Sequence, residues 1–551
     1  MSKNLSELSG RKGIEESLFD KMGQLAQERG TPSVEELDQL ADEFLIGKAN
    51  TFGTATFYDF LKPENQGKRA YVCNGTACVC AGTQDKVTKQ LEKHLQPSEI
   101  GHMTCLGRCH ENAAFNYNGK NFSGKALENL DQIIGKETEL NSDTYHVKSG
   151  ANEILTNPFS EVDQYYAPFI DALTKDSKSV LEEIKISNVR GRGGAGFPMG
   201  LKLEFCRNTE NATKFIICNA DEGDPGAYSD RYLLEQRPHS VLFGMLIAGY
   251  VTHASYGILY IRAEYPESIQ IVQDAIDALK EKGLIGRNIQ GTEFSFEFKI
   301  IQAQGSYICG EETALINSIE GQRPEVRVRP PFPAQQGLFN KPTIVNNVET
   351  LAALHHIISN GGSAWKAIGT ERSSGTKLVS LDSFFNKPGI YEVDMGTPLA
   401  TVFNEFGGGF KSEVKAVQIG GPLGGLVPAH KIDALTLDFE SFANEGFLLG
   451  HASVVCVPQD FPIIQFIEHL FDFASYESCG KCFPCRLGTK RGQEMASQAM
   501  NSDYKIDREL FHDLLTTLEE GSLCAHGGGI PLPVRNALEY FDDELKQYFN
   551  S

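Results

Sequence analysis

The sequence predicts an α/β protein of several domains, with a mixed centre and helices at both ends. Three observations lead to this fold class. The chain has 551 residues, which is enough for three or four domains of ordinary size. Short apolar strands alternate with amphipathic helices through the middle of the chain. Most of the 13 cysteines fall into two sets, one near each end, and each set marks a local unit.

The first predicted region covers residues 1–138. Its opening segments read as short helices; "SVEELDQLADEFL", for example, has apolar residues at helical spacing. A strand "KRAYVCNG", a helix "TQDKVTKQLEKHL" and a hairpin-like return "AAFNYNGKNFSG" follow. The region therefore reads as helices in front of a small α/β unit.

The second predicted region, residues 139–373, repeats a strand-then-helix scheme. The strands "KFIICNA", "GILYIRAEYP" and "FEFKIIQAQG" are each followed by a helical pattern. This alternation predicts a largely parallel sheet, with ligands at the carboxyl ends of its strands. The apolar stretch 241–261 contains glycines and polar residues, so we interpret it as a buried helix followed by a buried strand, not as a membrane span.

Two further regions complete the chain. Residues 374–455 contain short strands with turns, as in "TKLVSLDSF" and "AVQIGGPLGG", and predict a β-rich insert. Residues 456–551 contain amphipathic helices and predict a C-terminal helical bundle.

The charge balance narrows the classes of partner. Lys and Arg total 51 against 72 Asp and Glu, a net charge of -21, which argues against nucleic acid. The N-terminus lacks a signal-peptide pattern, so we expect a cytoplasmic protein that does not insert directly into a membrane.

The C-terminal cysteines have the spacing of cluster ligands. Cys479, Cys482 and Cys485 form C-x2-C-x2-C, and Cys524 is the one later cysteine. Three thiolates from one tight turn and a distant fourth suit a [4Fe-4S] cluster. Zinc is the alternative, because C-x2-C pairs also bind zinc.

The N-terminal cysteines form two pairs, Cys73 with Cys78 and Cys105 with Cys109. Two pairs separated by a helix suit a [2Fe-2S] cluster, each pair holding one iron. Cys80 either replaces Cys78 or is a buried thiol, and we favour the thiol. The other cysteines lie in or beside apolar strands or at strand ends and read as packing residues: Cys206, Cys218, Cys309 and Cys456.

A glycine-rich segment, "VRGRGGAGFPMGLKLEF", begins at residue 189. Its glycines let backbone N–H groups approach a phosphate and a flat ring, and Arg192 and Lys202 supply positive charge. A mobile turn is the alternative reading.

Polar segments follow the predicted strands. In "NADEGDPGAYSDR", the acidic and amide side chains can hydrogen-bond the hydroxyls of a ligand; a solvated acidic turn is the alternative. In "PTIVNNVET", amide side chains stand at a helix start, where they can meet a phosphate. The proline-rich "RVRPPFPA" supplies a cation, Arg329, and an aromatic ring, Phe332, to the predicted ligand site. A stiff surface connector is the alternative interpretation.

These motifs together resemble one family. "RGRGGAGFPMGLK", "CNADEGDPGAYSDR", "GSYICGEETALINSIEG", "RPPFPAQQGLFNKPTIVNNVET" and "ESCGKCFPCRLGT" with "SLCAHGG" are similar to the NADH-oxidising flavoprotein subunit of respiratory complex I. "VCNGTAC" with "CLGRC" is similar to its small thioredoxin-like [2Fe-2S] subunit, here fused in front. The resemblance implies a Rossmann-like domain for FMN and NAD, a β-grasp insert and a helical [4Fe-4S] bundle.

The resemblance also implies site residues. FMN would be held by Gly191, Arg192, Gly193, Gly194, Lys202, Asn219, Asp221, Glu222, Tyr260, Glu264, Val345, Asn346, Asn347 and Thr350. NAD would stack on the flavin, contacting Phe197, Phe205, Arg329 and Phe332, with Glu264 at its ribose. No residue acts as acid or base; Glu222 and Asp224 support hydride transfer to FMN, which passes electrons singly to the clusters.

Departures from the respiratory pattern guide the choice of partner. Asp224, Leu203 and Arg329 stand where many respiratory members have Glu, Trp and Lys, respectively. We therefore favour the NAD-linked subunit of a soluble hetero-oligomeric enzyme, with a molybdenum or tungsten formate dehydrogenase as partner. A hydrogenase and complex I are the alternatives, and a non-catalytic iron-sulfur scaffold is a remote one.

Overall fold

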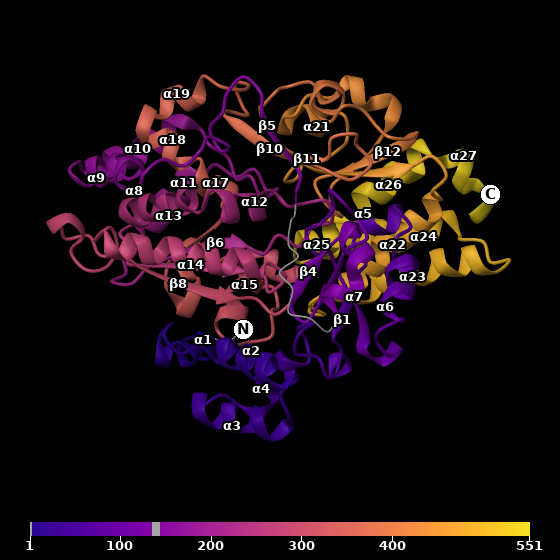
Figure 1. Ribbon diagram of the computed structural model, residues 1–551, viewed down its shortest axis with the longest axis horizontal. Helices are drawn as coiled ribbons and strands as arrows, with labels where there is room; N and C mark the ends of the chain where they lie inside the picture. Colours follow the sequence, from indigo (N-terminus) through magenta and orange to yellow (C-terminus); the bar gives the residue numbers. More distant parts are fainter. Residues whose placement is uncertain (1–2, 135–143, 551) are drawn as a thin grey trace.

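The computed structural model describes residues 3–134 and 144–550. Figure 1 shows four packed parts: helices at the N-terminus, a small α/β unit, a central sheet with helices, and a β-rich part followed by C-terminal helices. The predicted α/β multidomain class is confirmed. The predicted boundary at residue 138 lies outside the described residues.

The N-terminal helices pack on the central sheet. They are α1 (Lys3–Ser9), α2 (Leu18–Arg29), α3 (Val34–Phe44) and α4 (Lys48–Ala55). A capping box between Ser33 and Glu36 starts α3. Phe19 and Tyr58 share one apolar core with strand residues such as Ile301. These helices therefore cover one face of the sheet, and in Figure 1 they lie below it.

The small α/β unit has a four-stranded sheet in the order β2-β1-β3-β4. Strand β1 pairs in parallel with β2 and antiparallel with β3. Its elements are β1 (Ala70–Cys73), β2 (Ile100–Met103), β3 (Phe115–Tyr117), β4 (Lys120–Phe122), α5 (Thr76–Cys80), α6 (Gln84–Leu91) and α7 (Leu130–Ile133).

The central sheet is wholly parallel, in the order β8-β7-β6-β9. Its strands are β6 (Phe215–Ala220), β7 (Tyr256–Ile261), β8 (Glu297–Gln302) and β9 (Thr343–Asn347). Strands β7 and β8 extend the sheet on one side of β6, whereas β9 pairs with the other side of β6. This reversal is the topological switch point at which open α/β sheets bind ligands.

Helices surround this sheet. They are α8 (Val162–Tyr165), α9 (Ala167–Leu173), α10 (Ser177–Ser187), α11 (Met199–Asn208), α12 (Ser229–Gln236), α13 (Pro238–Thr252), α14 (Pro266–Glu281), α15 (Glu312–Ile319), α16 (Pro333–Gln336), α17 (Val348–Ala352), α18 (Leu354–Asn360) and α19 (Gly362–Lys366).

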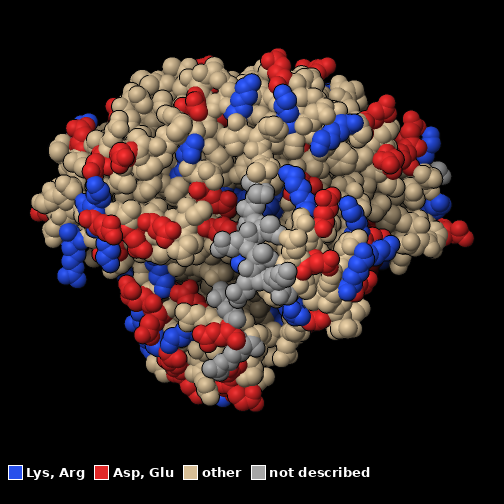
Figure 2. Space-filling view, in the orientation of Figure 1, with Lys and Arg blue, Asp and Glu red and all other residues tan. Residues whose placement is uncertain are grey.

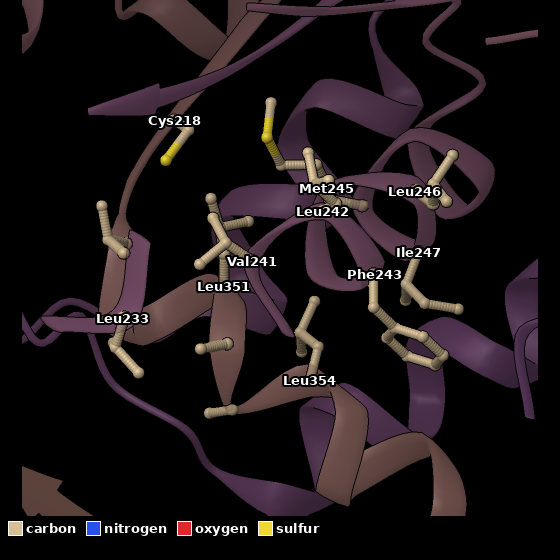
Figure 3. Close-up of a cluster of buried hydrophobic side chains, with 14 of the residues drawn as sticks. Cys218, Leu233, Val241, Leu242, Phe243, Met245, Leu246, Ile247, Leu351 and Leu354 are labelled. Atoms are coloured by element: carbon tan, nitrogen blue, oxygen red, sulfur yellow. The ribbon is translucent and has the colours of Figure 1, made fainter. Parts of the chain in front are cut away.

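The apolar stretch 241–261 forms helix α13 and strand β7, as predicted. Figure 3 shows its side chains in a cluster with those of α17 and α18 and with Cys218. A Cβ at Gly244 would lie 2.0 Å from the Leu351 carbonyl oxygen, so only glycine permits this approach of α13 to α17. Within residues 3–134 and 144–550, no helix has the length and apolar character to cross a membrane.

The β-rich part has a six-stranded sheet in the order β13-β12-β14-β10-β11-β5. Its elements are β10 (Thr376–Leu381), β11 (Gly389–Asp394), β12 (Val414–Ile419), β13 (Gly425–Pro428), β14 (Ser453–Pro458), α20 (Leu399–Thr401) and α21 (Phe439–Asn444). Strand β5 (His146–Ser149), from the start of the second predicted region, joins it in parallel with β11. Strand β14 spans the predicted boundary at residue 455.

The C-terminal helices share an apolar core with strand residues of the β-rich part and with Cys80. They are α22 (Ile463–Tyr476), α23 (Phe483–Asn501), α24 (Arg508–Gly521), α25 (Ala525–Gly529), α26 (Pro531–Tyr540) and α27 (Asp542–Leu545). Figure 2 shows acidic and basic side chains interspersed over one face of the whole molecule.

Candidate functional site

The N-terminal cysteines converge at one end of the small α/β unit. Cys73 ends β1, Cys78 lies in α5, and Cys105 and Cys109 lie in the loop after β2. The Sγ atoms of Cys105 and Cys109 are 3.4 Å apart, and all four side chains are buried.

Backbone N–H groups donate to these sulfurs, and the crowding of the thiols affects their pKa values. The N–H groups of Gly75, Gly107 and Gly226 donate to Cys73, Cys105 and Cys109 sulfurs at 3.4, 3.4 and 3.2 Å. The neighbouring Cys105 thiol and burial raise the pKa of Cys109. Thiolates crowded and buried in this way need a bound cationic centre, which an iron-sulfur cluster supplies.

Cys80 is separated from this group. It is buried in an apolar cluster with residues of α22 and α26, and burial raises its pKa. These surroundings support the predicted buried thiol.

The C-terminal cysteines are brought together by two helix starts. Cys479 and Cys482 precede α23, Cys485 lies in its first turn, and Cys524 precedes α25. A Cβ at Gly527 would lie 2.7 Å from Cys485 Cβ, so a glycine is needed for α25 to approach α23. Burial raises the pKa of Cys485 to about 11, and Cys482 and Cys524 are half-buried.

The described part of the chain, residues 3–134 and 144–550, has no site for a single metal ion. No group of three or more His, Cys, Asp or Glu side chains there is arranged to hold one metal ion. The ligand sets of both clusters remain predictions that rest on cysteine spacing and on the contacts above.

The glycine loop is the part of the glycine-rich segment that precedes α11, and it packs against the end of β9. The Arg192 N–H donates to Thr350 Oγ1 at 2.8 Å, and a Cβ at Gly193 would lie 3.0 Å from Asn347 Cβ. Asn347 in turn accepts from the Thr350 N–H at 3.3 Å and donates to Asp230 at 2.6 Å. The glycine loop is thus fixed against the end of β9, beside the switch point.

Among the residues that the structure describes, the buried polar atoms without a hydrogen-bond partner include Arg192 Nη1, Asp221 Oδ2 and Asn346 Nδ2 at this edge. Burial lowers the pKa of Arg192 to about 10 and raises the pKa of Asp221 well above its ordinary value. A buried guanidinium and amide suit a phosphate and a polar ring edge, and a carboxyl group suits hydroxyls. The residues present therefore fit a flavin mononucleotide.

Lys202 and Arg329 gather around one carboxylate. Lys202 Nζ lies 2.9 Å from Glu312 Oε2 and donates to the Val345 carbonyl at 2.6 Å. Arg329 Nη1 lies 3.3 Å from Glu312 Oε1. Around this charge group, α11 packs against α16, and three phenylalanines are exposed: Phe197, Phe205 and Phe332.

Two acidic residues of the loop after β6 have different surroundings. Glu222 is buried and accepts from the N–H groups of Asp230 and Arg231 at 2.9 and 3.1 Å, so it caps helix α12. Asn219 donates to the Gly310 carbonyl at 2.8 Å. Asp224 is more open and accepts from Tyr307 Oη at 2.7 Å.

Three family models match the chain. Residues 184–356 match the Nuo51 FMN-binding domain, residues 465–548 the NADH-ubiquinone oxidoreductase-F iron-sulfur binding region, and residues 8–138 the thioredoxin-like [2Fe-2S] ferredoxin. The NADP-reducing hydrogenase subunit HndC of Solidesulfovibrio fructosivorans is 40% identical over 386 residues, covering 70% of this chain and 78% of that protein. The mitochondrial NADH dehydrogenase (ubiquinone) flavoprotein 1 of Dictyostelium discoideum is 32% identical over 449 residues, covering 78% of this chain and 94% of that protein.

The chain belongs to the NADH dehydrogenase flavoprotein 1 family. A solved structure of an NAD+-reducing [NiFe]-hydrogenase is also similar, at 28% identity and a TM-score of 0.86 over 97% of this chain and 93% of that one. The predicted family is confirmed. This member is an oxidoreductase that acts on nicotinamide dinucleotides, with FMN, a [4Fe-4S] cluster and a [2Fe-2S] cluster as cofactors.

Two predicted site residues of this family member lie elsewhere than expected. Tyr260 is fully buried, and its hydroxyl is 2.8 Å from Ser318 Oγ, so it supports the sheet from within the core. Glu264 is buried and paired with Arg262 at 2.8 Å, in a small cavity that Asp59, Asp221 and Glu477 also line. The Glu264 side chain is only 4% exposed and is held by Arg262, whereas the three phenylalanines are exposed, so we no longer place Glu264 beside the dinucleotide.

Sequence reasoning missed Tyr307, Glu311 and Glu312 as site residues. They follow β8 at the carboxyl edge of the sheet, the position that drew attention to the acidic loop after β6. Glu311 caps α15 by accepting from the Thr313 and Ala314 N–H groups, which leaves Glu312 facing Lys202 and Arg329. The signal was present in "GSYICGEETAL", which lies directly after a predicted strand.

Proposed function

We propose that this chain exchanges electrons between NAD(H) and a partner enzyme, as the flavoprotein subunit of a hetero-oligomer. The observation that carries the proposal is the meeting of the glycine loop, the unpartnered Arg192, Asp221 and Asn346 atoms and the exposed phenylalanines at one sheet edge. A bound FMN would take two electrons from the dinucleotide and release them singly to the clusters.

The residues of the chain would bind and orient. Arg192 would meet the phosphate, and Asp221 and Asn346 would meet hydroxyls and the ring edge. The phenylalanines would stack on an adenine, because flat apolar rings exposed beside cations suit a nucleotide base. Asp224 would fix the position of the dinucleotide above the flavin, without acting as an acid or base.

We assign the preference for NAD over NADP to Glu312 in place of Glu264. A carboxylate beside the ribose repels a 2'-phosphate. Changing Glu312→Gln removes this repulsion, so the ratio of NADPH to NADH oxidation should rise about tenfold. Glu264→Gln is the matched control and should leave the ratio unchanged. A rise in the control alone would restore Glu264 to the dinucleotide site.

The partner would dock at the C-terminal cysteines. Phe483 and Leu487 lie one turn apart on α23 and are 67% and 58% exposed, and Leu523 beside Cys524 is 41% exposed. Exposed apolar side chains grouped at a half-buried cluster site suit a protein interface. They would bring a further iron-sulfur protein within electron-transfer range.

Two partners are proposed. The segment "GGPLGG" and the substitutions Asp224, Leu203 and Arg329 favour a formate dehydrogenase containing molybdenum or tungsten. The likeness to an NAD+-reducing [NiFe]-hydrogenase extends over 97% of the chain and favours a hydrogenase as the second candidate. Metal analysis of the complex purified anaerobically separates them, since nickel would identify a hydrogenase and molybdenum or tungsten a formate dehydrogenase.

Reduction of ferricyanide by NADH tests the activity itself. The purified chain supplied with FMN should oxidise NADH without any partner. If it does not, a non-catalytic iron-sulfur scaffold becomes the better reading.

A further inference from the structure

A histidine of the β-rich insert, residues 374–455, reaches the dinucleotide site. His451 lies in the loop before β14, and its Nε2 is 2.7 Å from Oδ2 of Asp224, in the loop after β6. The two side chains are only 12% and 20% exposed. This ion pair therefore joins the insert to the central domain at an enclosed position.

The backbone packs closely around the His451–Asp224 ion pair. A Cβ at Gly421 would lie 2.5 Å from Asp224 Oδ1, and a Cβ at Gly420 would lie 2.8 Å from Gly450 Cα. Both Gly420 and Gly421 have a φ of 83°. Gly450 in turn contacts the glycine loop, since a Cβ at Gly194 would lie 3.8 Å from its Cα. Two turns of the insert thus form a wall of the site.

Both oxygens of Asp224 are engaged. Oδ1 accepts from Tyr307 Oη at 2.7 Å, while Oδ2 faces His451. A carboxylate held from two sides has one orientation, whereas a free one rotates. Tyr307 and His451 together therefore fix where the charge of Asp224 lies.

The charges around His451 favour its protonated form. Burial alone lowers the pKa of His451, but Asp224 and the nearby Glu222 raise it above its ordinary value. Lys377 of β10 acts in the opposite sense. While it is protonated, the imidazolium offsets the carboxylate charge of Asp224 beside the glycine loop.

We propose that His451 is a positioning residue for the dinucleotide, which in its protonated form fixes Asp224 and offsets the negative charge at the wall of the site. The inference rests on the proposed function and adds a residue of the insert to it. A dinucleotide carries negative phosphates, so an unbalanced Asp224 weakens its binding. The contribution of the pair is complete below the ordinary histidine pKa, about 6.5. It is lost as pH rises through the raised pKa of His451.

The dissociation constant for NAD+ tests this, measured by calorimetry on the FMN-loaded protein between about pH 6 and about pH 9. In the wild type it should rise about fivefold over this range, while in His451→Gln it should be high and nearly constant. His430→Gln removes an exposed histidine of the same insert and should behave as the wild type. In turnover, the change should fall on KM for NADH and leave kcat nearly constant.

The outcomes are distinct. A wild-type protein that oxidises no NADH overturns the proposed function. If the wild-type protein is active but binds NAD+ with the same dissociation constant at every pH, the role of His451 is overturned. This outcome does not depend on the folding of the His451→Gln variant. Equal pH profiles in wild type and His451→Gln overturn it too. His451→Arg keeps a positive charge at every pH and should restore tight binding at high pH.

Discussion

The two cysteine sets differ in how they are enclosed. Cys73, Cys78, Cys105 and Cys109 are all at most 2% exposed. The central domain reaches them through the Gly226 N–H, and the insert through a hydrogen bond from the Ser383 N–H to the Cys109 carbonyl at 3.0 Å. At the other set, Cys482 and Cys524 are half-buried, beside exposed Phe483 and Leu487.

This difference separates two kinds of redox site. The N-terminal set is surrounded by the chain itself, so its properties are decided within the subunit. The C-terminal set opens towards the surface, and a partner that covers Phe483 and Leu487 would change its surroundings. We infer that electrons leave or enter the chain at the C-terminal set, and that the N-terminal cluster stores them.

The largest expected effect follows from removing a ligand. Cys524→Ala should abolish the electron paramagnetic resonance signal of the [4Fe-4S] cluster and leave that of the [2Fe-2S] cluster, because the two sets share no cysteine. Cys80→Ala is the matched control and should preserve both signals. Survival of both signals in Cys524→Ala would remove this residue from the ligand set.

Enclosure should also govern how fast the clusters are lost. Local opening exposes half-buried groups more often than fully buried ones. With a chelator present, we expect the [4Fe-4S] signal to decay about tenfold faster than the [2Fe-2S] signal. Equal decay rates would mean that the difference in burial has no kinetic consequence.

The exposed apolar pair should matter only when a partner is present. Phe483→Ala should weaken binding of the partner by about 2 kcal/mol through lost apolar contact. Reduction of ferricyanide by the isolated chain should be unchanged. Val34→Ala changes an exposed apolar residue of α3 and serves as control. Loss of partner binding in the control as well would argue against a docking site specific to α23.

The smallest effect concerns the contact between the two sets. Thr104 beside Cys105 donates to Glu477 Oε1 at 2.8 Å, and Glu477 Oε2 accepts from the Tyr307 N–H at 2.8 Å. Thr104→Ala removes one hydrogen bond, worth about 1 kcal/mol. The temperature at which the [2Fe-2S] absorbance is lost should fall by about 2 °C. Ser497→Ala, near the C-terminal end of α23, is the control and should leave this temperature unchanged.

Local patterns predicted much of the architecture. The strand-helix alternation predicted the parallel sheet, and the apolar stretch that became α13 and β7 was read correctly because glycines and polar residues interrupt it. The helix of "SVEELDQLADEFL" also formed, although Val34 is exposed. Sequence alone did not indicate that the N-terminal helices would cover the central sheet, because that contact joins apolar faces far apart in the chain.

The site shows the same division. Residue types and spacing determined the cysteine sets, the glycine loop and the acidic loop, since each is a short segment whose chemistry is local. Tertiary structure decided that Tyr260 lies in the core, that Glu264 pairs with Arg262 and that Glu312 faces the cations. It also placed His451 against Asp224 across 227 residues of sequence. Such pairings depend on how strands and loops of different domains pack, and no local pattern of residues records that packing.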